Sequence, residues 1–181
     1  MGYHLNSLAN LPVDADVFFY VFVVHENFHE PLFEMIQKNF LEIARSTGKH
    51  AVIAQGLNPI SWNEEVATKY LGKNHAAYSA LLPALLITNA HPDNVLPTTM
   101  RLFVPLSGVE KRFGGWPVFF KLLTEFLQMK NHQFVDRFQA TDWAGNADKW
   151  LEAKPGAFGF AVNLNEILKW FRERQERPRY T

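Results

Sequence analysis

The amino-acid sequence predicts an α/β fold in which helices flank a mixed sheet. Residues 17–24 (VFFYVFVV) form a continuous apolar run that is rich in β-branched and aromatic side chains, which is typical of a strand buried on both faces. An amphipathic helix pattern follows this strand, and the strand–helix order then repeats through residue 72. Parallel strands joined by right-handed crossover helices are the simplest arrangement for such an alternation.

The first predicted helix begins at Pro31 and ends before Gly48. Proline suits the first helical position because it lacks an N–H that would find no helical partner there, and glycine suits a helix C-terminus. Apolar side chains recur at helical spacing within this segment, at Leu32, Phe33, Ile36, Phe40, Ile43 and Ala44. After it, residues 50–57 predict a second strand, and residues 63–72 predict a second helix that Asn63 opens and Gly72 closes.

Two further apolar runs predict strands within residues 80–90 and 100–106. Proline cannot donate a hydrogen bond to a strand ladder, so Pro83 fits only at the start of a strand or at a bulge. The segment His91-Pro92-Asp93-Asn94 between the two runs has the composition of a turn. Residues 116–130 carry a broad apolar face and predict a helix that packs onto the sheet.

The last fifty residues are less regular. We expect one short strand near residues 158–163 and an amphipathic helix at about residues 164–176. A chain of 181 residues is long enough for one domain with a substantial core. We therefore predict a single domain over residues 1–181, with its core at residues 17–130 and a C-terminal strand and helix extension at residues 131–181.

Composition limits the chemistry of this protein. The chain has no cysteine, which excludes disulfides, thiolate metal ligands and thiol redox reactions. Its 18 basic and 18 acidic side chains cancel, so no overall charge favours a nucleic acid or an acidic membrane as a partner. The sequence has neither a signal-peptide pattern nor an apolar run of about 18 residues. We therefore expect a soluble cytoplasmic protein.

Two sequence marks accompany this order of elements. Pro83 opens an apolar run in LLPALLI, and Gly114-Gly115 in FGGWP precede a predicted helix. Over residues 17 to about 130, the chain resembles the thioredoxin-like fold, whose members carry a cis-proline at the start of the third strand and, in glutaredoxins, a Gly-Gly pair before the last helix. The redox cysteines of that family lie at the N-terminus of the first helix, where this chain has His-Glu-Pro-Leu at residues 29–32. The resemblance therefore implies a member without redox activity.

Residues 25–29 read HENFH and match the H-E-x-x-H pattern of zinc peptidases. On a helix, His25 and His29 would share one face and hold a zinc ion, and Glu26 would act as a general base toward a metal-bound water. Pro31 argues against a helix through this motif, because its ring would clash with the carbonyl of Asn27. We therefore expect HENFH to lie in the loop before the helix.

Other arrangements of these residues stay open. A third metal ligand beside His25 and His29 could come from Glu64 or Glu65 on the next predicted helix. A loop that leads into a helix also offers N–H groups and a positive dipole to an anion. Gly114-Gly115 could bind a carboxylate or phosphate in the same way, although a plain turn is the simpler interpretation.

The end of the chain interleaves basic and aromatic side chains. Its basic residues are Lys169, Arg172, Arg174, Arg177 and Arg179. Such interleaving occurs in proteins whose aromatic rings stack on nucleic-acid bases. However, Glu173 and Glu176 dilute the charge, and the apolar positions need burial, so an amphipathic helix packed on its own domain is the favoured interpretation. If the apolar face were exposed, it would favour a homodimer.

We therefore predict a protein that binds a protein or small-molecule ligand, without a cofactor, rather than an enzyme. The predicted ligand-binding residues are His25, His29, Pro83, Gly114 and Gly115, since ligands of open α/β sheets lie beyond the carboxyl ends of strands. One alternative is a metal-dependent hydrolase that uses His25, Glu26 and His29 with zinc. Another is a transferase-like pocket for a small anionic or peptide ligand.

Overall fold

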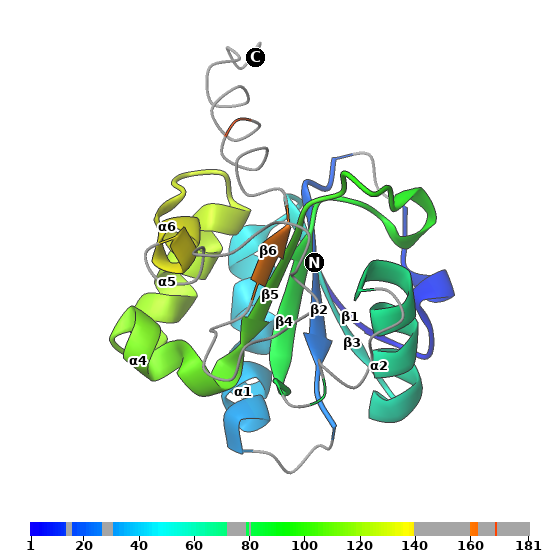
Figure 1. Cartoon of the computed structure of the whole chain (residues 1–181), viewed down its shortest axis with the longest axis horizontal. Coiled ribbons are helices and arrows are strands. Elements are labelled where there is room, and N and C mark those ends of the chain that lie inside the picture. Colours follow the sequence, from blue (N-terminus) through cyan, green and yellow to red (C-terminus); the bar gives the residue numbers. More distant parts are fainter. Residues whose placement is uncertain are drawn as a thin grey trace.

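The computed structural model describes residues 1–13, 16–26, 31–71, 79, 81–139, 160–162 and 169. These residues form a six-stranded mixed sheet with the strand order β1-β3-β2-β4-β5-β6. Helices lie on both faces of this sheet (Figure 1). The α/β class that the sequence predicts is therefore confirmed.

The strands of the sheet are β1 (Gly2–Leu5), β2 (Phe19–Val24), β3 (Ala51–Gly56), β4 (Ala84–Thr88), β5 (Arg101–Pro105) and β6 (Phe160–Val162). Strands β1 and β2 both run parallel to β3, whereas β4, β5 and β6 each run antiparallel to the preceding neighbour in the sheet. The register pairs Val24 with Ala84 and Ala84 with Pro105. The end of β2, the start of β4 and the end of β5 therefore lie together at one end of the strands. We call this end of the sheet the β2 edge.

The helices are α1 (Pro31–Thr47), α2 (Pro59–Val66), α4 (Val109–Phe113), α5 (Trp116–Leu127) and α6 (Gln133–Gln139). A π-helical turn, η2 (Ala67–Leu71), continues α2. Three single 3₁₀ turns are η1 (Leu8–Asn10), η3 (Pro92–Asn94) and η4 (Leu106–Gly108). Helix α1 begins at Pro31 as predicted.

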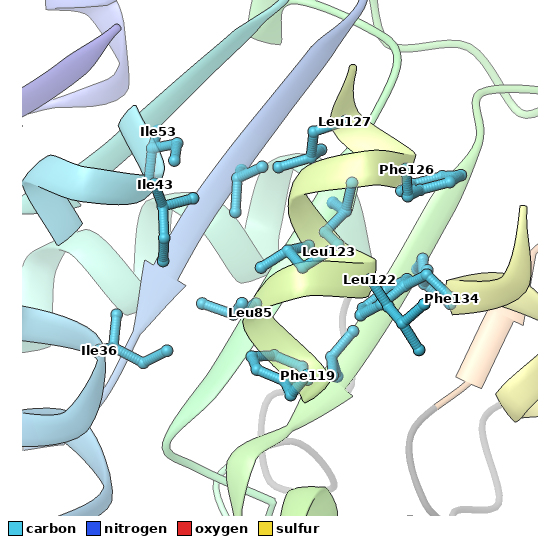
Figure 2. Close-up of a cluster of buried hydrophobic side chains, with 14 of the residues drawn as sticks. Ile36, Ile43, Ile53, Leu85, Phe119, Leu122, Leu123, Phe126, Leu127 and Phe134 are labelled. Carbon is cyan, nitrogen blue, oxygen red and sulfur yellow. The ribbon is translucent and has the colours of Figure 1, made fainter. Parts of the chain in front are cut away.

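One face of the sheet is covered by α1, α5 and α6. The close-up of this core shows Ile36 and Ile43 of α1 together with Leu123 of α5 and Leu85 of β4 (Figure 2). Phe134 of α6 also belongs to this cluster and is fully buried. The start of the predicted extension is therefore part of the same core, in which each fully buried large apolar side chain contributes about 1.5–3 kcal/mol.

The opposite face is covered by α2 and η2. Trp62 of α2 and Tyr70 of η2 pack on Phe22 of β2, with ring centroids at 6.0 and 5.1 Å from that of Phe22. The Trp62 indole N–H donates to the Val23 carbonyl at 2.9 Å. Since alternate side chains of a strand point to opposite faces, β2 supplies apolar side chains to both layers.

Helix α2 begins four residues before the predicted start at Asn63. Asn58 is the actual N-cap, because its side chain accepts hydrogen bonds from the backbone N–H groups of Ile60 and Ser61, and Pro59 occupies the first helical position. The predicted end at Gly72 lies outside the described residues. Position 63 is instead a helical residue whose amide faces the end of β2.

One described strand and two described α-helices were not predicted. Strand β1 has four residues and only one buried side chain, so its apolar periodicity is too short to recognise. Helices α4 and α6 are five and seven residues long, which is less than the span over which helical periodicity becomes clear. Predicted strand 158–163 is confirmed by β6, whereas predicted helix 164–176 lies outside the described residues except for Lys169, which is helical.

No helix among the described residues has the length and apolar character needed to cross a membrane.

Gly56 is required where β3 passes beneath α2. A Cβ at this position would lie 2.3 Å from Cβ of Trp62, and Trp62 is fully buried. We therefore expect Gly56→Ala to lower the free energy of unfolding by about 1–3 kcal/mol, measured by urea denaturation. The control Gln37→Ala, at an exposed position of α1, should change it by less than about 0.5 kcal/mol. An unchanged unfolding midpoint for Gly56→Ala would contradict this account of the packing.

Candidate functional site

His25 directly follows β2 and is fully buried. Its ring stacks on Phe33 of α1, with centroids 3.7 Å apart and planes at 22°. The His25 backbone is held from the other layer, because its N–H donates to Asn63 Oδ1 at 3.3 Å and its carbonyl accepts from Asn63 Nδ2 at 2.8 Å. Residue 25 therefore joins α1 and α2 at the edge of the sheet, and its side chain belongs to the packed interior.

The HENFH motif is not helical at its start. β2 ends at Val24 and α1 begins at Pro31, while residues 27–30, which include His29, lie outside the described residues. Within the described part of the chain, no three His, Asp or Glu side chains are grouped closely enough to hold a metal ion. Glu65, one expected third ligand, accepts hydrogen bonds from the Ser7 hydroxyl at 2.9 Å and the Leu8 N–H at 2.7 Å. That carboxylate has a structural role in holding η1 against α2.

Pro83 lies beside His25 at the same edge of the sheet. The Leu82–Pro83 peptide bond is cis, and β4 begins at the next residue. The Pro83 carbonyl accepts a hydrogen bond from the Leu106 N–H at 2.8 Å, so the start of β4 is fixed to the end of β5. Because Val24 pairs with Ala84, the two predicted binding residues flank one rung of the ladder.

Gly114 and Gly115 form the turn between α4 and α5. Gly114 has φ +78° and its N–H donates to the Glu110 carbonyl, which closes α4, and Gly115 has φ +126° immediately before α5. These dihedral angles lie in regions that favour glycine, so a turn requirement accounts for both residues. Along the chain, η4 and α4 lie between the end of β5 and this pair, and neither glycine lines the pocket at the end of β2.

A pocket of about 580 Å³ opens at this edge, on the face of the sheet that α2 covers. We name it the β2-edge pocket. Its apolar lining comes from β2, α2, η2, the segment before β4 and β5, through Val24, Ile60, Val66, Ala67, Leu71, Leu82 and Phe103. Ser79 and Asn63 add polar groups to the wall. The pocket therefore combines a hydrophobic interior with a few hydrogen-bonding groups, as ligand sites usually do.

The rim of the β2-edge pocket is acidic. Glu26 and Glu64 both line it and are both exposed, and no basic side chain occurs among its described lining residues. Ile60 adds an apolar side chain at the rim that is 76% exposed. Carboxylates next to an apolar wall attract a ligand that is cationic or neutral and partly hydrophobic, and they repel an anion.

The sequence predicts ligand-binding residues at this edge, but most of the residues that line the pocket are not among them. Glu64 was considered only as a metal ligand, and Ile60, Leu82 and Phe103 carry no motif. Their signal is weak, because each is a single apolar residue: Ile60 lies near the start of α2, Leu82 precedes β4 and Phe103 lies within β5. Strand pairing is what brings them together.

A second pocket, of about 440 Å³, lies at the opposite edge and is lined in part by Tyr20, Asn89, His91 and Thr99. His91 caps η3, since its Nδ1 accepts from the Asp93 N–H at 3.3 Å and its Nε2 lies 3.2 Å from the Leu11 carbonyl. A carbonyl can only accept, so Nε2 is the donor of this hydrogen bond. The turn predicted at residues 91–94 is confirmed, and His91 has a structural role in it.

Comparisons of this chain with protein-family models, with curated proteins and with solved structures find no match. The functional argument therefore rests on the geometry of the β2-edge pocket and its surrounding residues.

The Asn63 amide should be the main link between α2 and the end of β2. Asn63→Ala removes both hydrogen bonds to the His25 backbone, and we expect the free energy of unfolding to fall by about 1–3 kcal/mol, measured by urea denaturation. Glu64→Ala, one residue further along the same helix and exposed, should leave it within about 0.5 kcal/mol of the parent value. Equal stability of the two variants would show that these bonds do not hold the edge.

Tyr70 should make the stability of the protein sensitive to alkaline pH. Its hydroxyl donates to the Ala90 carbonyl at 3.0 Å. Burial raises the pKa of Tyr70, nearby Tyr20 and Asp93 raise it further, and Arg101 opposes them. The unfolded chain loses this proton first, from about pH 10, so stability should fall as pH rises above that value. In Tyr70→Phe this decline in the free energy of unfolding should be shallower; an identical slope in both proteins would contradict the expectation.

Proposed function

We propose that this chain is a thioredoxin-like binding protein without redox activity, and that its ligand occupies the β2-edge pocket. The cis Leu82–Pro83 bond ahead of β4 supports the likeness. So does the sheet, in which parallel β2 and β3 are followed by the antiparallel pair β4 and β5. The absence of cysteine from the sequence leaves binding rather than thiol chemistry as the activity of such a protein.

The observation that carries the proposal is the chemistry of the β2-edge pocket. Its interior is apolar, and its exposed charged groups among the described residues are the carboxylates of Glu26 and Glu64. A ligand that fits must bury apolar surface and tolerate or use negative charge at the rim. A peptide segment or small molecule with a hydrophobic part and a basic group meets both requirements, whereas an anionic ligand does not.

A matched pair of short peptides tests this proposal. Both contain leucine and phenylalanine, and one carries two arginines where the other carries two glutamates. We expect the basic peptide to bind more tightly in isothermal titration calorimetry, and its affinity to fall as salt concentration rises.

Variants locate this binding on the protein. Glu64→Gln should weaken binding of the basic peptide by about two- to five-fold, as expected for one exposed ion pair. Glu42→Gln, which neutralises an exposed carboxylate on α1 and on the other layer, should not weaken it. Equal affinity for both peptides, or equal effects of the two substitutions, would reject the proposed site.

A further inference from the structure

We propose that the pocket at the opposite end of the strands from the β2 edge is a second binding site, for an uncharged ligand in which a carbonyl group is joined to an apolar group. We name this pocket, of about 440 Å³, the loop pocket, because residues 89–100, which connect β4 to β5, form most of its wall. The inference does not depend on the ligand of the β2-edge pocket. It rests on the order of the loop and on the hydrogen-bonding groups, apolar side chains and charge of the lining.

Residues 89–100 are held in one shape by their own hydrogen bonds. A connection between neighbouring antiparallel strands usually has about two to five residues, and this one is longer. Asn89 Oδ1 accepts from the Met100 N–H at 3.0 Å, which closes the base of the loop. Further along, the Leu96 N–H donates to Thr99 Oγ1 at 2.8 Å, and the Leu96 carbonyl accepts from the Thr99 N–H at 3.0 Å. A wall that is already ordered lowers the entropic cost of binding a ligand.

Two buried side chains also fix the loop to the rest of the protein. Arg101 Nη2, at the start of β5, donates to the Leu96 carbonyl at 2.8 Å. The His91 ring, within the loop, donates from Nε2 to the carbonyl of Leu11 at 3.2 Å. The loop extends beyond the ends of β4 and β5 (Figure 1), and these contacts hold it there against the N-terminal segment.

Two side chains of the lining have donor hydrogens that no described residue accepts. Asn89 uses its Oδ1 for the Met100 N–H, and both hydrogens of its Nδ2 remain for a ligand. Thr99 Oγ1 accepts from the Leu96 N–H, and its own hydrogen is donated to no described residue. Thr99 is only 6% exposed. A ligand carbonyl matches these groups, because it only accepts and its oxygen has two lone pairs.

Apolar side chains lie beside these donors. Val13 and Leu96 both line the loop pocket and are 75% and 61% exposed. They come from segments far apart in the sequence, and half-buried Val17 adds a third apolar side chain to the same lining. An apolar group of the ligand would remove this surface from water, which stabilises the complex.

The lining carries no formal charge. No Asp, Glu, Lys or Arg side chain occurs among the described residues that line the loop pocket. A charged ligand group placed there would lose hydration without gaining an ion pair. The loop pocket therefore favours an uncharged ligand, whereas Glu26 and Glu64 give the β2-edge pocket an acidic rim.

Three compounds of similar size test the site on the full-length chain. N-acetyl-leucinamide is uncharged, N-acetyl-leucine is an anion and leucinamide is a cation at slightly acidic pH. Binding is followed by NMR of the ¹⁵N-labelled protein. We expect N-acetyl-leucinamide to bind at least about three-fold more tightly than either charged compound, and to shift the side-chain amide signals of Asn89 until they saturate.

A matched pair of substitutions tests the apolar contact. Leu96→Ala should weaken binding of N-acetyl-leucinamide by about three- to ten-fold, because apolar surface is lost from the site. Leu41→Ala, on α1, should not weaken it, although Leu41 is also 61% exposed. Since both side chains are exposed, neither substitution should prevent folding.

Asn89→Asp separates ligand binding from the structure of the loop. The aspartate retains an oxygen that can accept from the Met100 N–H, but it replaces the Nδ2 donor by a negatively charged oxygen. We expect N-acetyl-leucinamide to bind about ten-fold more weakly and leucinamide to become the tightest of the three compounds. Gln37→Glu makes the same change of amide to carboxylate on the exposed side of α1 and should leave the order unchanged.

Several results would overturn the proposal. These are the absence of saturable shifts, equal affinities for the three compounds, equal effects of Leu96→Ala and Leu41→Ala, or an Asn89→Asp protein that binds as the parent does. Shifts confined to residues of the β2-edge pocket, such as Asn63, would also overturn it. A protein that binds N-acetyl-leucinamide in the loop pocket but neither test peptide would retain this inference and lose the proposed function.

Discussion

The structure depends on the burial of β2 from both sides. All six residues of this strand, Phe19–Val24, are buried, and they alternate between the layer formed by α1 and α5 and the layer formed by α2. Each layer therefore uses side chains of β2 to complete its core. Burial of the apolar side chains of β2 stabilises the helices on both faces of the sheet. One of these helices, α2, also lines the pocket.

At the end of β2, the buried apolar strand is followed by residues that make polar contacts. Val24 is the last apolar residue, and the next residue, His25, packs its ring on Phe33 while Asn63 holds its backbone. The cis bond before Pro83 turns the chain into β4 directly beside this point. Three segments far apart in sequence thus meet at one edge, where strand pairing and the Asn63 hydrogen bonds hold them together.

The β2-edge pocket differs in character from the packed layers around it. Its interior is apolar, and its exposed charged groups among the described residues are the carboxylates of Glu26 and Glu64. A hydrophobic ligand with a basic group matches both features, because apolar surface is removed from water inside the pocket and opposite charges attract at its rim.

The sequence by itself determined the elements whose signals are local. The apolar run of β2, the start of α1 at Pro31 and the position of Pro83 before β4 follow from side-chain composition and from the missing N–H of proline. The tertiary structure decided the rest: the four-residue strand β1, the start of α2 at Pro59, and the meeting of Glu26, Glu64 and Phe103 around one pocket. Strand order and register bring these residues together, and neither is encoded in any local period of the sequence.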